Sequence, residues 1–230
     1  MALKLNARFV GNVYVVECVG SIVLGGESQS LEAALEQGAM EFTRFVLELS
    51  GLERMDSIGL GALVLFATRI RKRGGDIRLA GAPAFLANLL ELTRLSSLLV
   101  VFASEEEAIL SFLTQSAAEE KPRRFGTRQS SVLVFEQAAE LCVFVRSVLV
   151  QHGFDVLSTT SLRDAKTLLR VESVDTILVG PGTEQLPAET ALGALRAMAP
   201  RAAGMRLDAE FKRRDAGDAT AVLLGMFGVA

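Results

Sequence analysis

The apolar residues in the first half of the chain alternate between strand-like and helix-like spacing. Apolar side chains at every second position or in short unbroken runs predict strands, and these cover residues 13–18, 21–24, 42–49, 77–80 and 98–102. Apolar positions three or four apart predict helices, which run through 31–38, 57–73, 83–90 and 104–113. This order favours an α/β fold in which a mixed sheet is covered by helices.

The second half repeats the alternation more regularly. Strands are predicted over 132–135, 154–157 and 176–179, and helices over 141–149, 161–169 and 192–198. A strand–helix order repeated three times predicts a doubly wound parallel sheet. Beyond Arg201 the pattern is weak, although apolar residues in 222–227 fit an amphipathic helix.

A polar stretch separates the two halves. It reads QSAAEEKPRRFGTRQS over 115–130 and contains Pro122 and Gly126, and such a composition is typical of linkers. We therefore expect an N-terminal domain over 1–116, a linker over 117–130 and a C-terminal domain over 131–230.

Composition narrows the function classes. The 230 residues are 50% hydrophobic and carry a formal net charge of −3, which excludes a disordered chain and gives no bulk attraction to nucleic acid or an anionic membrane. Two cysteines and one histidine are too few for a disulfide framework or a zinc site. No apolar run approaches the roughly 20 residues of a membrane helix. We therefore expect a cytoplasmic protein that uses no cofactor or metal and binds neither nucleic acid nor membranes.

One junction carries candidate chemistry. A predicted strand ends near Leu49, and Asp56-Ser57 opens the next predicted helix, with Ser57 where an N-cap residue belongs. The free N–H groups and the positive end of a helix favour a dianion at such a position. Gly59 and Gly61 leave the helix surface bare for close approach by another backbone. The plain alternative is that Asp-Ser only starts a helix.

The motifs around this junction resemble the STAS domain, the module of bacterial anti-sigma-factor antagonists. The resemblance covers residues 8–114 and rests on LELS at 47–50, MDSIGLGAL at 55–63, RKRGG at 71–75, LELTRL at 90–95 and SEEEA at 104–108. It implies that Ser57 is phosphorylated by a serine kinase that is also an anti-sigma factor, and that a PP2C-type phosphatase restores it. The implied partner-binding residues are Asp56, Ser57, Ile58, Gly59 and Leu60, with Gly25 and Gly26 from a neighbouring loop.

Two positions depart from the family pattern. Glu48 stands where members commonly have Asp, and residues 20–23 (GSIV) lack an Asp that often follows the second strand, in a loop beside the serine. Three functions are open: an adaptor switched by phosphorylation of Ser57, a constitutive STAS scaffold or transport-accessory subunit, and, ranked last, an enzyme that uses Asp56-Ser57. The enzyme ranks last because no His or Lys base lies nearby in the sequence.

Residues 131–200 resemble, more loosely, the receiver domain of response regulators. Glu136-Gln137 follows the first strand where receivers have an acidic pair, and Gly180 stands where they have the phosphoacceptor Asp. A single carboxylate forms no cage for Mg²⁺ and leaves no acceptor. We expect a degenerate, truncated pseudo-receiver that serves as a docking or homodimerisation surface.

Overall fold

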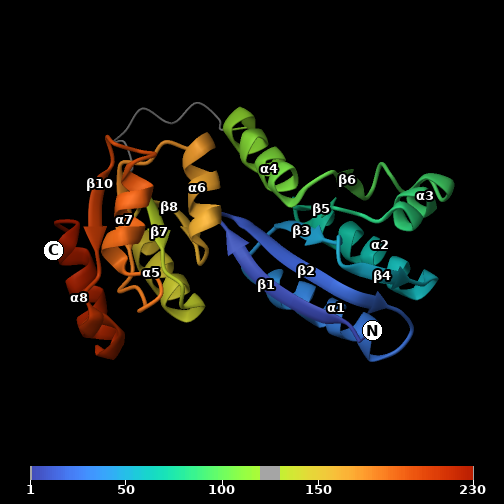
Figure 1. The fold of residues 1–230 in the computed structure, drawn as a ribbon, viewed down its shortest axis with the longest axis horizontal. Coiled ribbons are helices and arrows are strands. Elements are labelled where there is room, and N and C mark those ends of the chain that lie inside the picture. Colours follow the sequence, from blue (N-terminus) through green and yellow to red (C-terminus); the bar gives the residue numbers. More distant parts are fainter. Residues whose placement is uncertain (1, 120–129, 230) are drawn as a thin grey trace. The chain divides into compact units, whose positions relative to one another are not determined.

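The computed structural model describes residues 2–119 and 130–229 (Figure 1). The chain divides into two compact units, Met1–Glu120 and Lys121–Ala230, and each has its own apolar core. Within the predicted linker, residues 117–119 end a helix, and 120–129 lie outside the described residues.

The first unit is built on a mixed sheet. Its elements are β1 (Lys4–Val10), β2 (Val13–Ile22), α1 (Gly26–Gly38), β3 (Arg44–Glu48), β4 (Leu52–Met55), α2 (Ser57–Lys72), β5 (Asp76–Ala80), α3 (Ala84–Leu92), β6 (Val100–Phe102) and α4 (Glu105–Glu119). The strand order is β1-β2-β3-β5-β6, and β4 pairs with the end of β2. β1 is antiparallel to β2, whereas the other neighbours are parallel. The predicted mixed sheet is confirmed.

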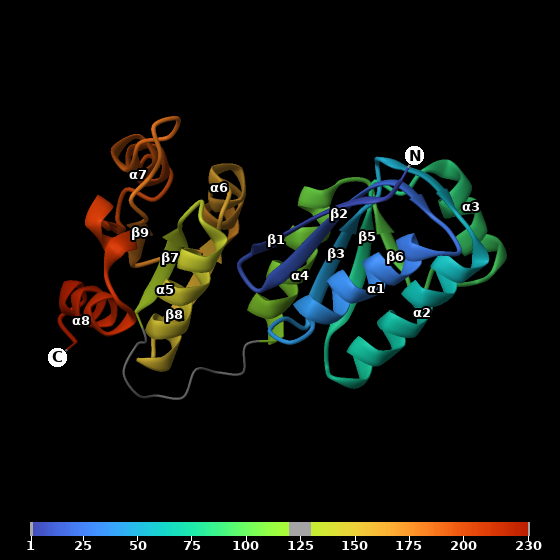
Figure 2. The ribbon, with the colours of Figure 1, turned by 90° about the horizontal axis from the view of Figure 1, so that it is seen from below.

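Helices cover both faces of this sheet. α1 and α2 contact each other and pack on one face, and α4 covers the other (Figure 2). Phe45 of β3 meets Phe66 of α2 edge to face, with ring centroids 4.9 Å apart. On the opposite face, the buried Arg78 guanidinium of β5 lies 3.7 Å from the ring centroid of Phe112 in α4. Burial of such large side chains fixes α2 on the sheet, so the start of α2 has a defined position.

Strand β2 is longer than the sequence pattern predicts. Residues 13–17 pair with β3, and 20–22 pair with β4, with a register shift after Gly20. Gly20 has a φ of 109°, a conformation that a side chain would strain. The prediction of a separate strand over 21–24 is therefore wrong, because the same strand continues and changes partners at Gly20.

The second unit is the predicted doubly wound parallel sheet. Its elements are β7 (Ser131–Phe135), α5 (Ala139–Gln151), β8 (Asp155–Thr159), α6 (Leu162–Val171), β9 (Thr176–Val179), α7 (Ala188–Arg196), β10 (Ala203–Arg206), the 3₁₀ helix η1 (Ala209–Arg213) and α8 (Ala216–Met226). The strand order is β10-β9-β7-β8, and every pair is parallel. α5 contacts α8, and α6 contacts α7. Val132–Phe135 and Ile177–Val179 are buried at the centre.

Candidate functional site at the start of helix α2

Asp56, and not Ser57, is the N-cap of α2. Asp56 has an extended backbone, and its Oδ1 accepts hydrogen bonds from the N–H groups of Ile58 and Gly59 at 3.0 and 2.9 Å. Ser57 is the first helical residue, so the prediction that it caps the helix is wrong by one position. Asp and Ser are equally good N-cap residues, and the negative carboxylate also suits the positive helix end.

The same aspartate ties the helix to the end of β2. Its Oδ2 accepts from the Leu24 N–H at 2.7 Å, and its own N–H donates to the Ile22 carbonyl at 3.1 Å. The hydrogen bonds from Gly59 and then Leu24 hold the pKa of Asp56 below its usual value. The carboxylate is therefore ionised at neutral pH and joins α2 to the loop between β2 and α1.

Ser57 is exposed beside this cap. Its hydroxyl makes no hydrogen bond to any residue in the described part of the chain. A serine nucleophile needs a base in hydrogen-bond contact, so this arrangement does not support an enzyme that uses Ser57. A free, exposed hydroxyl is instead accessible to a modifying protein.

The residues after Ser57 face in different directions. Ile58 is 44% exposed, whereas Gly59 and Leu60 are buried. A Cβ on Gly59 would lie 2.7 Å from the Ile22 carbonyl oxygen, while one on Gly61 would meet nothing within 4 Å. The space beside Gly61 is thus open to another molecule, as expected from the sequence. The space beside Gly59 is filled by β2 of the same unit.

Side chains from other elements complete the surface. Leu24 is 71% exposed and precedes the exposed Gly25 and Gly26. A groove of about 510 Å³ runs next to the cap, lined by Val23, Glu53, Arg54, Met55, Asp56 and Phe85. Sequence reasoning missed the groove because β4 reads as a loop: Leu52 is its only buried residue. Phe85, within the helix predicted over 83–90, is 40% exposed.

Comparison with known proteins identifies this unit. A family model for the STAS domain matches residues 4–108. This part of the chain is a STAS domain. The family model covers less than half of the chain. No curated protein matches this chain.

Several solved structures are similar to the STAS domain. One is an anti-sigma factor antagonist from Mycobacterium paratuberculosis, at 20% identity, covering 48% of this chain and 93% of that one with a TM-score of 0.44. SpoIIAA of Bacillus in its phosphorylated form has 18% identity, coverage of 48% and 99%, and a TM-score of 0.41. A sulfate transporter family protein from Wolinella succinogenes has 22% identity, coverage of 46% and 88%, and a TM-score of 0.42.

Glu48, where STAS domains commonly have Asp, is accommodated at the end of β3. Its Oε1 accepts from the Ser50 N–H at 3.0 Å. A Cβ on Gly81 would lie 2.9 Å from the same oxygen, and Gly81 has a φ of +60°. The longer acidic side chain therefore occupies space that a glycine at 81 leaves open.

In the second unit, the carboxyl ends of β7 and β9 bring together the three residues that the receiver resemblance singles out. The Glu136 side chain is 2% exposed, and its Oε1 accepts from the Ala138 N–H at 2.8 Å. A Cβ on Gly180 would lie 1.6 Å from Glu136 Oε2, so Glu136 fills the space that a side chain at 180 would need. Gln137 is exposed and accepts from the Thr183 hydroxyl at 3.1 Å.

A lysine from the stretch beyond Arg201, where the sequence pattern is weak, reaches these strand ends. Lys212 Nζ, from η1, lies 3.5 Å from Glu136 Oε1. A buried carboxylate needs a partner charge or hydrogen bonds, and Lys212 supplies the charge. Nothing in the local sequence links Lys212 to Glu136, because the contact depends on how the chain after β10 folds back.

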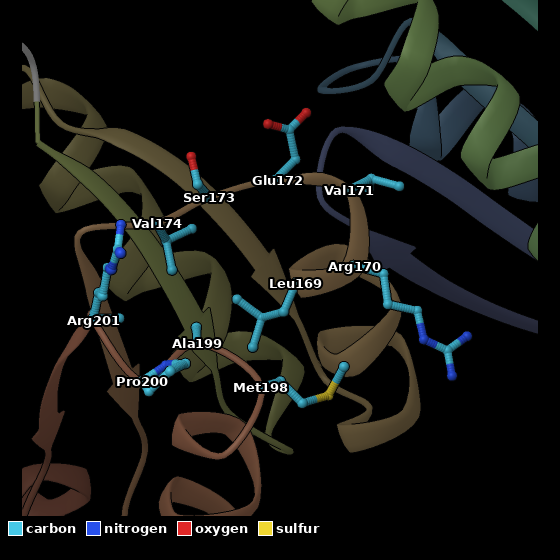
Figure 3. A pocket seen from close by; sticks show the side chains of 11 residues that line it. Leu169, Arg170, Val171, Glu172, Ser173, Val174, Met198, Ala199, Pro200 and Arg201 are labelled. Carbon is cyan, nitrogen blue, oxygen red and sulfur yellow. The ribbon is translucent and has the colours of Figure 1, made fainter.

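A second cavity lies at the opposite edge of this sheet. It has a volume of about 430 Å³ and is lined by residues before β9 and before β10. Figure 3 shows the apolar side chains of Leu169, Val174 and Met198 in it, with Glu172 pointing away from them. Ligands of parallel α/β sheets bind at the carboxyl ends of strands, so this cavity, at the amino ends, is a poor candidate for a functional site.

The two cysteines and the possible metal ligands form no further candidate site among the described residues. Burial raises the pKa of the Cys18 and Cys142 thiols to about 12, so both are neutral thiols. Within residues 2–119 and 130–229, no three acidic, Cys or His side chains gather closely enough to hold a metal ion. Over the same residues, every helix is too short or too polar to cross a bilayer.

Proposed function

We propose that the protein is a cytoplasmic signalling adaptor of the anti-sigma-factor-antagonist type, which is not itself an enzyme. It binds a partner that is both anti-sigma factor and serine kinase, and phosphorylation of Ser57 switches that binding. The supporting observation is that the Ser57 hydroxyl is exposed and has no hydrogen-bond partner among the described residues, while Asp56 performs the capping. The serine hydroxyl is thus available for modification because it is not itself the helix cap.

The surface around Ser57 is suited to a protein partner. Leu24, Ile58 and Phe85 are large apolar side chains that are 71%, 44% and 40% exposed, and exposed apolar groups gathered near one site are typical of interaction surfaces. Gly25 and Gly26 belong to the same surface. The buried Gly59 and Leu60 contribute by fixing the position of Ser57 and Ile58.

Phosphorylation changes the charge of this surface. The kinase transfers the terminal phosphoryl group of a nucleoside triphosphate to Ser57 Oγ: the new O–P bond forms as the bond to the departing nucleoside diphosphate breaks, and the hydroxyl proton passes to a base of the kinase. A PP2C-type phosphatase reverses this by hydrolysis, which returns the hydroxyl and inorganic phosphate. The ester adds about −1.5 to −2 charges at neutral pH.

A docked partner would have to desolvate this charge next to the Asp56 carboxylate. Burying uncompensated like charges in an interface costs a few kcal/mol, which corresponds to a loss of affinity of about 10²-fold. Ser57→Ala should bind the partner and Ser57→Asp should not. The partner is first isolated from native lysate as a protein retained by the wild-type bait and lost from the Ser57→Asp bait, and its affinity for both variants is then measured by calorimetry. Equal affinities would contradict the switch.

Two observations favour the alternative, a constitutive STAS scaffold or transport-accessory subunit. The loop after β2 lacks the acidic residue common in the family, and the first-turn N–H groups of α2 are already bonded to Asp56. Mass spectrometry of the protein isolated from its own cells decides between the two. A complete absence of phosphate on Ser57 while the kinase is active would favour the scaffold.

We also propose that the second unit is a pseudo-receiver that docks or dimerises. Gly180 offers no phosphoacceptor, and Glu136 is paired with Lys212. Val222, Leu224 and Met226 of α8 are half-buried apolar residues that would fit a homodimer interface. Sedimentation of the wild type and of Leu224→Glu tests this, because a dimer formed through α8 should dissociate in the variant.

A further inference from the structure

Asp56 connects helix α2 and the loop between β2 and α1 through one carboxylate. Oδ1 accepts from two N–H groups of α2, and Oδ2 accepts from Leu24 in the loop between β2 and α1. Beyond the Asp56 carboxylate, Leu24 is held by no other hydrogen bond in the described part of the chain. The loop carries the exposed Leu24 side chain and Gly25, whose φ of +136° is a conformation that residues with a side chain rarely adopt. The Leu24 amide is therefore held by the Asp56 side chain, whereas the Gly25 carbonyl is held by the Ser28 hydroxyl at 3.1 Å.

A phosphate on Ser57 would compete with this carboxylate. The first-turn N–H groups of Ile58 and Gly59 are the natural donors for an anion at the start of α2, and both already donate to Asp56. The phosphate and the carboxylate are adjacent in sequence and repel each other. A dianion is favoured over a monoanion at the positive end of a helix.

A second place for the carboxylate exists nearby. Arg54 of β4 lines the same groove as Asp56, is exposed, and has no ion-pair partner among the described residues. A carboxylate turned into the groove would meet this guanidinium. A carboxylate at the start of α2 and one turned toward Arg54 would interact differently with a phosphate on Ser57, which is the condition for shifting a conformational equilibrium.

We propose that phosphorylation of Ser57 displaces the Asp56 carboxylate from the start of α2, breaks its hydrogen bond to Leu24 and releases Leu24 from its present position. This rests on the proposed function only in taking Ser57 as the phosphorylated residue. The modification then alters two parts of the partner-binding surface: the charge at Ser57 and the position of the apolar Leu24.

The test uses the full chain with phosphoserine installed at position 57 during translation, so that neither kinase nor partner is needed. The readout is the Leu24 amide in ¹⁵N NMR spectra. In the unmodified protein it should show the downfield shift of an N–H bonded to a carboxylate. In the phosphoprotein the shift should be lost, and exchange of the Leu24 amide with solvent should be roughly tenfold faster.

Two variants make the result specific. Asp56→Asn, which lacks one carboxylate oxygen, should weaken the Leu24 hydrogen bond without any phosphate. Phosphoserine placed at exposed Thr68, on the same helix but far along it, should leave the Leu24 amide unchanged. An unchanged Leu24 amide in the phosphoprotein, with phosphate confirmed by mass, would overturn the proposal, and so would an equal change from the phosphate at 68. Partner affinity is measured separately, so either result leaves the proposed function to be judged on its own data.

Discussion

At the scale of single residues, Asp56 and Ser57 divide two tasks between neighbouring positions. Asp56 satisfies the first-turn N–H groups and anchors Leu24, and Ser57 offers a free hydroxyl. Sequence reasoning placed this pair at the start of the helix but assigned the N-cap to Ser57, because Asp and Ser have the same preference for that position. Either of two adjacent capping residues can adopt the extended backbone, and the choice depends on where β4 ends. The sequence pattern did not predict β4.

The division of tasks predicts unequal effects on stability. Ser57→Ala removes no hydrogen bond and should change the free energy of unfolding by no more than about 0.5 kcal/mol. Asp56→Ala removes the cap and the tie to Leu24, so its unfolding midpoint should fall clearly below that of Ser57→Ala. Urea unfolding of both variants, followed by circular dichroism, measures the difference. A larger loss for Ser57→Ala would show that Ser57 is the cap.

At the scale of elements, the close approach of α2 to β2 holds Ser57 in place. The Ile22 carbonyl, which accepts from the Asp56 N–H, also lies where a Cβ on Gly59 would fall. The spacing of Gly59 and Gly61 was visible in the sequence. Which of the two faces the protein could not be read from it, since that depends on the rotation of α2 set by buried residues such as Phe66.

The two glycines of α2 should therefore respond in opposite ways to alanine. Gly59→Ala places a methyl group 2.7 Å from a backbone oxygen and should destabilise the unit by about 1–3 kcal/mol. Gly61→Ala meets open space and should stabilise the helix by up to about 1 kcal/mol. Thermal unfolding of the pair gives the comparison, and a matching loss in both variants would contradict the packing of α2 described above.

The ion pair between η1 and β7 gives a second test at this scale. Lys212→Met leaves the buried Glu136 without its partner charge and should cost about 1–3 kcal/mol. Glu136→Gln in the same chain should recover part of that loss. Arg213→Met, at the exposed neighbouring position, is the control and should have little effect. Equal stability of Lys212→Met and Arg213→Met would mean that the ion pair contributes nothing.

At the scale of the whole molecule, two units of similar size have separate cores and different sheets. The periodicity of apolar residues predicted both sheet types, because buried parallel strands appear as unbroken apolar runs such as those at 132–135 and 176–179. It did not predict β1, β10 or η1, which contain few buried residues. An element with few buried side chains leaves little periodic pattern, and its pairing is decided by neighbours distant in the sequence.

Separate cores predict that damage to one unit stays within it. Leu47 of β3 and Leu178 of β9 are both fully buried, and truncating either to Ala should cost about 2–5 kcal/mol. Hydrogen exchange followed by mass spectrometry reports protection for each peptide separately. Leu47→Ala should lower protection in peptides of 2–119, and Leu178→Ala in peptides of 130–229. Loss of protection across both units from one substitution would show that they unfold as a single cooperative body. A change at Ser57 could then alter the stability of the second unit.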